Sequence, residues 1–395
     1  MSSVREHNQL AILETIFTKG ETSRALLAKE LRVSKPAISD NLEPLLNLGI
    51  VEEAGEGESA ALGGRKPIML RFNGGHKYII AIDLNYSRPF FVLGSLDNQI
   101  LTEFEVPVDD SADSNAYLRI IKNGINILMA SHNVSEEDLA CIAIASPGMF
   151  DDNGNLCSIN PLYKGFPWAT INIRPYLNSN FNIPVIIKND ILAATVGEWE
   201  KEESRPDDML FLGCGLGLGS GIIIDSELYE GRNFSAGQLF DYIDSETIKT
   251  GKTLEDRVCI NGLLQKIKLA VEEGKTRVAA CSGDGDIVFQ DVVDAYSKGD
   301  PFVMSCIRSI GEELGVVALN MMSFLSIKNL ILGGEYAVFG ETLLESMGKV
   351  FSSYGNFTPN LKISKQGRYS GIFGLFSLSR SYYFHEVCKC TRKAD

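Results

Sequence analysis

The sequence PVIIKNDILAATVGE, residues 184–198, joins a short apolar run directly to a segment with helical spacing. Residues 184–188 predict a buried strand, and residues 191–199 predict the helix that follows it. Asn189 and Asp190 lie between the two, at the carboxyl end of the strand, where α/β proteins bind their ligands. This junction therefore predicts an α/β fold and places a candidate binding site within it.

The same alternation of strand and helix extends over residues 76–395, which predicts α/β architecture with two similar lobes. The glycine run GLGLGSG, residues 215–221, lies between two of the predicted strands. Such a run lets backbone N–H groups approach a phosphate or a sugar, but it is also a common structural turn. The predicted strands cover residues 78–84, 89–96, 100–106, 141–145, 209–212, 221–224 and 329–332, and a further helix covers about 115–131.

Residues 1–75 have a different pattern, with three short amphipathic helices followed by two short strands at 50–53 and 68–72. Thr22 and Ser23 are candidate N-caps of the second helix, and Ser34 of the third. Pro44 is expected to kink the third helix or end it early. Its side chains expected to face inward are Ile38, Leu42, Leu45, Leu46 and Leu48.

Three helices and a hairpin describe a winged helix-turn-helix, whose third helix enters the DNA major groove. The loop LGGRKP, residues 62–67, resembles a wing with two adjacent cations, which suit phosphate oxygens or the minor groove. The alternative is a small helical protein-interaction domain. The predicted DNA-binding residues are Ser34, Lys35, Ala37, Ser39, Arg65 and Lys66.

Two features predict modest DNA affinity for a single module, so that a dimer is needed. Residues 1–75 hold nine Lys and Arg against ten Asp and Glu. Asp40 and Glu43 also lie on or near the reading face, where DNA phosphates would repel them.

The whole chain has 395 residues and a formal net charge of −14, which excludes a general coat for nucleic acid. No apolar run is long enough to span a membrane, and residues 1–10 lack the apolar core of a secretory signal. The eight cysteines are scattered without a C-x-x-C pair, which is typical of reduced thiols. We therefore expect a cytoplasmic protein.

Ordered motifs give the chain a resemblance to the ROK family (repressor, open reading frame, kinase), in particular to its transcriptional regulators. This resemblance implies a winged helix-turn-helix over residues 1–75, followed by a two-lobed, actin-like sugar-kinase fold. The implied lobes are residues 76–195 and 196–395, with a C-terminal helix returning to the first lobe. The motifs are GGRKP at 63–67, SPGM at 146–149, PV…KND…GE at 184–198, GLGLGSG at 215–221, AGQ at 236–238 and LGG at 332–334.

The resemblance also implies a sugar site in which Asp190 matches the family's catalytic base. A plainer role for Asp190 is to cap the helix beginning at Ile191. The residues that the resemblance assigns to sugar binding are Asn160, Asn189, Asp190, Gly221, Gln238, Asp241 and Glu255.

Several departures from the family pattern argue against catalysis and against metal. Gln238 and Asp241 replace a Glu and a zinc-binding His, and no cysteine-rich zinc motif follows, so no structural zinc is expected. The segment DLNYS, residues 83–87, replaces the phosphate motif D-x-G-x-T. Leu216 or Leu218 also occupies the place of a Thr hydroxyl, so ATP binding is not expected.

The resemblance implies a sugar-responsive, DNA-binding transcriptional regulator, expected to be a repressor, that does not act as an enzyme. Its partners would be operator DNA, a sugar or sugar phosphate, and further copies of itself in a homodimer or tetramer, with no membrane. One alternative is an active ATP-dependent sugar kinase with an appended DNA-binding domain. Another is a regulator whose sugar site has decayed and which a protein partner controls.

Overall fold

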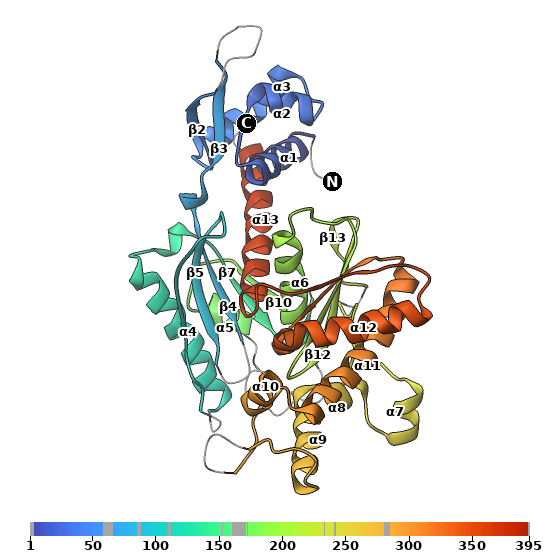
Figure 1. Ribbon diagram of the computed structural model, residues 1–395. Coiled ribbons are helices and arrows are strands. Elements are labelled where there is room, and N and C mark those ends of the chain that lie inside the picture. The colour runs from blue at the N-terminus through green and yellow to red at the C-terminus, as the bar shows by residue number, and fades with distance from the viewer. Residues whose placement is uncertain are drawn as a thin grey trace. The chain divides into compact units, whose positions relative to one another are not determined.

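The computed structural model describes residues 4–57, 66–84, 88–109, 112–151, 153–159, 171, 173–232, 234–240, 242–279 and 285–393 (Figure 1). The chain forms two compact units. Unit 1 comprises Met1–Ser146, Gly165–Ile187 and Leu375–Asp395, and unit 2 comprises Pro147–Lys164 and Lys188–Gly374.

The N-terminal part of unit 1 contains three helices and a three-stranded antiparallel sheet in the order β1-β3-β2. Ser23 accepts a hydrogen bond from the Leu26 N–H and caps α2, and Ser34 caps α3 in the same way through Ala37. This is the arrangement of a winged helix-turn-helix. The elements are α1 (Val4–Lys19), β1 (Glu21–Ser23), α2 (Arg24–Glu30), α3 (Lys35–Asn47), β2 (Val51–Glu56) and β3 (Ile68–Phe72).

Three local predictions in this region were wrong. Thr22 does not cap α2, because it lies buried in β1, a strand that the sequence did not reveal. Leu48 is 48% exposed, since it follows the last turn of α3 instead of lying on its inner face. Of the two outcomes expected for Pro44, an early end of α3 was wrong. The helix continues to Asn47, because packing of the fully buried Leu45 outweighs one lost backbone hydrogen bond. A kink at Pro44 stays a prediction.

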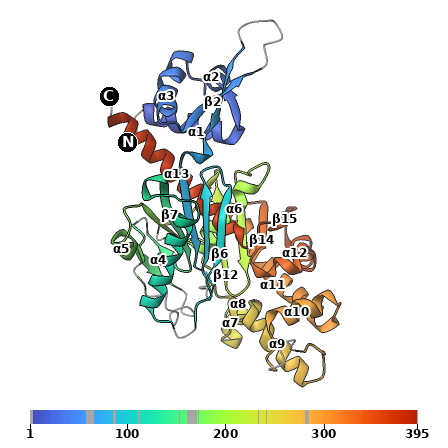
Figure 2. The same ribbon diagram turned by 90° about the vertical axis from the view of Figure 1, so that its left-hand side faces the viewer.

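The hydrophobic core of this domain includes side chains from the other end of the chain. Phe384, Val387 and Cys388 of helix α13 (Tyr369–Lys393) are buried in the same cluster as Ile12, Leu42 and others of the first three helices. The ring of Phe72 packs edge-on against both Phe17 and Phe384, with centroids 5.6 and 5.4 Å apart. In Figures 1 and 2 the red end of α13 lies beside the blue helix α1.

The remainder of unit 1 is built on a five-stranded sheet in the order β10-β7-β4-β5-β6. Strand β4 pairs with β7 in parallel and with β5 antiparallel. Helix α4 (Ser114–Ser131) packs on this sheet (Figure 2). The strands are β4 (Tyr78–Asp83), β5 (Phe90–Ser95), β6 (Ile100–Glu105), β7 (Leu139–Ser146) and β10 (Val185–Asn189), and α5 covers Ile173–Asn178.

Unit 2 repeats this plan with a sheet in the order β13-β12-β11-β14-β15, in which β11 pairs antiparallel with β12 and parallel with β14. The strands are β11 (Met209–Cys214), β12 (Leu218–Ile224), β13 (Glu227–Leu228), β14 (Asn329–Gly333) and β15 (Asn360–Ile363), and β8 (Met149–Phe150) pairs with β9 (Leu156–Ser158). The helices are α6 (Asp190–Lys201), α7 (Ser245–Thr250), α8 (Leu254–Val258), α9 (Ile260–Glu272), α10 (Phe289–Ser297), α11 (Pro301–Leu325) and α12 (Gly340–Tyr354).

Two sheets with the same strand plan and helices against them are the α/β architecture expected for a two-lobed, actin-like domain. Strands predicted from continuous apolar runs are present, because full burial on both faces requires such runs. Within the described residues, no helix is both long enough and apolar enough to cross a membrane.

Candidate functional site

Asn189 lies where strand β10 ends and helix α6 begins, as the sequence predicts. Its backbone is extended, and its Oδ1 accepts a hydrogen bond from the Leu192 N–H at 3.1 Å, so Asn189 is the N-cap of α6. Its Nδ2 donates to the carbonyl of Gly148 at 3.0 Å. The side chain is 6% exposed, and both ends of its amide are used to hold the local structure.

Asp190 is the first residue of α6 and not its cap, which corrects the plainer role considered above. Its Oδ1 accepts from the N–H of Ile191 at 2.9 Å. Burial raises the pKa of Asp190 to about 6, and the negative charge of Glu335 adds to that shift. A carboxylate with a pKa near neutrality at the end of a strand suits hydrogen bonding to a polar ligand.

The glycine run is mostly strand, which corrects the expectation of a loop over residues 215–221. Residues from Leu218 onward form β12, because α6 packs directly over them. A Cβ at Gly219 would lie 2.8 Å from Cγ1 of Ile191, and a Cβ at Gly221 would overlap Oγ1 of Thr195. Close packing of α6 thus accounts for these glycines without any phosphate.

The segment that contains Gln238 is hydrogen-bonded to strand β12. Gly237 has a φ of +82°, and its carbonyl accepts hydrogen bonds from the backbone N–H and the Oγ of Ser220, at 3.1 and 2.8 Å. A Cβ at Gly237 would overlap the Ser220 carbonyl, so only glycine fits there. The structure therefore brings Gln238, Gly221 and the first turn of α6 into one neighbourhood of unit 2.

Glu255 of α8 is 5% exposed, and its Oε1 accepts from the N–H of Leu218 at 3.0 Å. This bond ties α8 to the start of β12. A second tie joins Lys188, the residue before Asn189, to both carboxylate oxygens of Glu230 at 2.6 and 2.8 Å. Both contacts hold segments that carry predicted sugar-binding residues.

The sugar-binding and DNA-binding roles of all the predicted residues stay predictions, and some of these residues lie outside the described part of the chain. The latter are Asn160, Asp241, Arg65 and the Asn85–Ser87 part of the altered phosphate motif. Asp83, which precedes that part, ends strand β4.

The Arg257 guanidinium holds the segment after residue 241 in place, at the position where the ROK family pattern has its zinc motif. Arg257 has a side chain only 11% exposed, and it donates to Asp244 Oδ2 at 2.5 Å and to Glu313 Oε2 at 2.8 Å. Its other contacts are Thr247 Oγ1 and the Lys252 carbonyl. Among the described residues, no group of three His, Cys, Asp or Glu side chains could hold a metal ion, and Cys259 is a buried core residue.

The predicted DNA-binding residues lie in the N-terminal domain of unit 1. Ser34, Lys35 and Ser39 are exposed, and Ala37 is half-buried. Asp40 and Glu43 are exposed on the same helix, as expected. Lys66 is exposed and lies two residues before β3, with its Nζ 3.8 Å from Oε2 of Glu56.

The sequence analysis gave no structural role to Glu198, although it quoted this residue in a motif, and it missed Arg257 and the inner face of α13. Glu198 is a 4% exposed carboxylate that accepts hydrogen bonds from Ser364 and Ser370. The apolar spacing of Phe384, Val387 and Cys388 is a helical signal for a buried face, but it does not say what covers that face.

Comparisons with known proteins agree with this architecture. A family sequence model, described as "ROK family", matches residues 79–381. The chain is 26% identical over 357 residues to the xylose repressor of Caldicellulosiruptor bescii, covering 88% of each chain. It is 28% identical over 321 residues to the xylose repressor of Staphylococcus xylosus, covering 80% of this chain and 78% of that one.

Two solved structures bear on the fold. A ROK family transcriptional regulator, a homologue of the E. coli MLC protein, superposes with a TM-score of 0.81 at 18% identity and covers 97% of this chain and 98% of its own. A ROK family glucokinase from Streptomyces griseus, in complex with glucose and AMPPNP, has a TM-score of 0.62 at 20% identity and covers 76% and 98%. These matches confirm the predicted fold.

Proposed function

The chain belongs to the ROK family, and we propose that it is a sugar-responsive, DNA-binding transcriptional repressor. One observation carries this proposal. The family match covers residues 79–381, and the residues before and after it share one hydrophobic core. In that core the winged helix-turn-helix packs on the end of α13. The glucokinase covers 76% of the chain, whereas the regulator covers 97%. The additional fifth of the chain corresponds in size to the N-terminal domain, which is the part suited to DNA.

We infer that the DNA-reading surface is the exposed face of α3, with Ser34, Lys35, Ala37 and Ser39, flanked by Arg65 and Lys66. Its cations are few, and Asp40 and Glu43 share the helix face. One module therefore binds DNA weakly, and a homodimer or tetramer supplies affinity by placing two modules on half-sites about one helical turn apart, or a multiple of it.

The effector in this proposal is a sugar or sugar phosphate bound at the start of α6, by Asn189 and Asp190, together with Gln238, Glu255, Gly221, Asn160 and Asp241. Several relatives are named xylose repressors, which makes D-xylose the first probe. An amide at Gln238 both donates and accepts hydrogen bonds, so it suits sugar hydroxyls without being a base. Sugar must bind the DNA-binding and the released states with different affinities, or it cannot act as a signal.

We further propose that the protein transfers no phosphate, although the family includes kinases and a Halalkalibacterium halodurans glucokinase is 24% identical over 289 residues. The sequence departures at residues 85–87 and at Leu216 or Leu218 support this. The domains proposed are residues 1–75, 76–195 and 196–395, in a cytoplasmic protein without metal or nucleotide.

The test is operator binding by the full chain. DNA fragments are first selected from a random pool without sugar, and their affinity is then measured with D-xylose, D-glucose, N-acetylglucosamine and their phosphates. We expect one of these to weaken binding at least fivefold. ADP release from ATP, Mg²⁺ and the same sugars, above a slow background, favours the kinase. DNA binding that no sugar changes, with no sugar-induced rise in melting temperature, favours a protein partner.

A further inference from the structure

Helix α13 is the one helix of the described chain whose residues belong to both units. Its first turns, up to Gly374, belong to unit 2, and the remainder belongs to unit 1. The family match ends at residue 381, so the last turns of α13 lie outside it, as does the N-terminal domain on which they pack.

In unit 2, the first turns of α13 cross helix α6 at very short range. A Cβ at Gly197 would overlap the carbonyl oxygen of Ser370, and a Cβ at Gly374 would overlap that of Ala193. Glycines at both positions let the two backbones touch. Lys201 at the end of α6 also lies over the ring of Phe373, 3.8 Å from its centroid.

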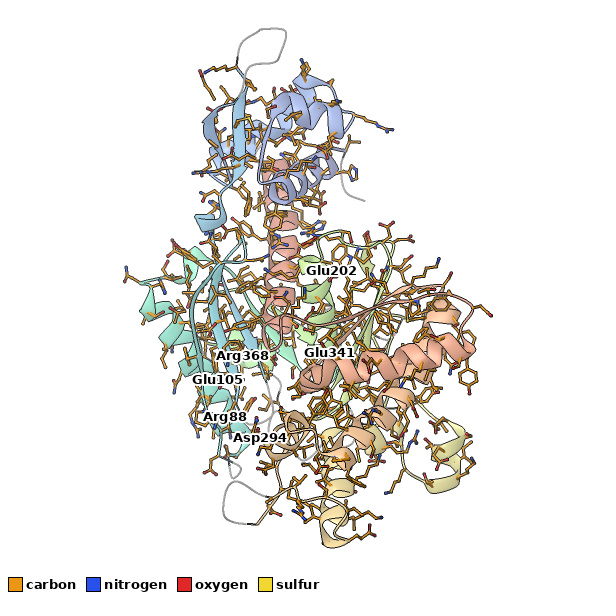
Figure 3. The ribbon with its side chains drawn as sticks, in the orientation of Figure 1. Arg88, Glu105, Glu202, Asp294, Glu341 and Arg368 are labelled. Atoms are coloured by element: carbon orange, nitrogen blue, oxygen red, sulfur yellow. The ribbon has the colours of Figure 1, made fainter. Side chains whose placement is uncertain are left out.

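A buried carboxylate fixes this crossing. Oε1 of Glu198, on α6, accepts hydrogen bonds from Oγ of Ser370 at 2.5 Å and from Oγ of Ser364 at 2.5 Å. Ser370 belongs to the first turn of α13, which follows Arg368 (labelled in Figure 3). The same α6 begins at Asp190, so the start of α6 carries the candidate sugar site and its third turn holds α13.

In unit 1, the last turns of α13 reach the recognition helix through a chain of buried polar groups. Thr391 Oγ1 donates to Oε1 of Gln9 at 2.8 Å, and Gln9 Nε2 donates to the Asn41 carbonyl at 3.3 Å. Gln9 is fully buried, and Thr391 and Asn41 are each 7% exposed. Asn41 lies one turn after Ala37 on α3, within the predicted DNA-reading helix.

We propose that α13 is the coupling element of this repressor, with Glu198 as the positioning residue at its start and the Thr391–Gln9–Asn41 chain as the contact at its end. A sugar that binds Asn189 and Asp190 displaces the first turn of α6. Because α6 and α13 are closely packed where they cross, α13 moves with it. The buried hydrogen bonds at Gln9 then favour one position of α3. This inference rests on the proposed function, because it needs both a sugar and an operator.

The first test compares wild type with Glu198→Gln and with Thr391→Val. Thr15→Val is the matched control for Thr391→Val, because Thr15 bonds only its own helix carbonyl at Ala11 and lies outside the coupling chain. Sugar affinity is measured by calorimetry with the wild-type effector from the panel, and operator affinity is measured with and without that sugar.

We expect both coupling variants to bind the sugar and the sugar-free operator within about threefold of wild type. The sugar-induced change in operator affinity should fall at least fivefold, and Thr15→Val should keep it. Thr391→Ser, which retains the donor, should restore it. Full sugar response in both Glu198→Gln and Thr391→Val overturns the coupling by α13.

Two further outcomes are distinguishable from that one. If Glu198→Gln does not fold, the comparison of Thr391→Val with Thr391→Ser decides the proposal, because both leave unit 2 untouched. If wild type binds operator and sugar without any effect of one on the other, the proposed function is overturned, and the coupling with it.

Discussion

The amide of Asn189 bonds the carbonyl of Gly148 at 3.0 Å, so the residue that opens helix α6 also holds the turn after strand β7. A predicted sugar-binding role and an observed structural role therefore meet in one side chain. Asp190 next to it holds no distant segment in this way, since its carboxylate accepts from the adjacent Ile191 N–H and its other hydrogen bonds are to its own backbone and to the Asn189 side chain.

This difference predicts different outcomes for the two residues. Asn189→Ala removes a helix cap and leaves the partly buried Gly148 carbonyl without its donor, which should lower the free energy of unfolding by about 1–3 kcal/mol. Asp190→Asn keeps the size of the side chain and should weaken the sugar-induced rise in melting temperature, with the sugar-free protein equally stable at pH 5. Urea unfolding and thermal shift measure both. An unchanged sugar response in Asp190→Asn contradicts the site.

The raised pKa of Asp190 predicts a pH dependence of stability. Its pKa is about 6 in the folded chain against 3.8 for an ordinary aspartate, so the folded state binds the proton more tightly than the unfolded state. This group therefore stabilises the fold increasingly as the pH falls from 6 towards 4, and that gain is lost as the pH rises through 6. Asp190→Asn, which stays neutral, should melt above wild type at pH 8, with the difference shrinking at pH 5. A difference that grows towards pH 5 has the wrong sign.

The close crossing of α6 and α13 predicts that one methyl group added at Gly197 greatly lowers the free energy of unfolding. Gly197→Ala places a Cβ onto the Ser370 carbonyl, and because that atom is backbone, one of the helices must move. The expected loss is about 1–3 kcal/mol or more of unfolding free energy. Gly348→Ala on α12 is the control, since nothing lies within 4 Å of its Cβ, and it should be neutral or stabilising by about 1 kcal/mol. Equal stability of the two variants contradicts the close crossing.

Much of the architecture could be predicted because its signals are local. Strand β7 is buried along its whole length and reads as a continuous apolar run, and Ser34 caps α3 from its place in the sequence. The glycine run was misjudged because the sequence does not show that Ile191 and Thr195 lie over Gly219 and Gly221. Glycine is required where a helix packs closely on a strand, and it is also required where a backbone approaches a phosphate. Only the folded structure shows which of the two reasons applies.

The part of the site that could not be predicted depends on contacts between distant residues. Gln9 and Thr391 are 382 positions apart, and no local pattern pairs them. Glu198 belonged to a recognised motif, but its partners Ser364 and Ser370 come from a strand end and a helix start far along the chain. The sugar-binding roles of all the predicted residues stay predictions: Asn160, Asn189, Asp190, Gly221, Gln238, Asp241 and Glu255.

The C-terminal helix should be as necessary to the DNA-binding domain as the first three helices. Phe384 is 2% exposed and packs on Phe72, so Phe384→Ala should cost about 3–5 kcal/mol in that core and reduce operator binding. The sugar-induced thermal shift should persist, because the candidate sugar residues lie in unit 2. Phe324→Ala is the control, since Phe324 is 90% exposed and should change stability by less than about 0.5 kcal/mol. Normal operator binding by Phe384→Ala contradicts the shared core.

The exposed face of α3 predicts opposite effects for its cation and its carboxylates. Lys35→Ala removes a positive charge at the start of the helix, so operator affinity should fall and the slope of log affinity against log salt should become shallower by about 1 for each module. Glu43→Gln removes an exposed negative charge from the same helix, so affinity should rise at low salt. Equilibrium binding to one operator at several salt concentrations measures both slopes. Lys29→Ala on α2 serves as a charge-matched control, and a loss equal to that of Lys35→Ala would show that net charge, and not the α3 face, determines DNA binding.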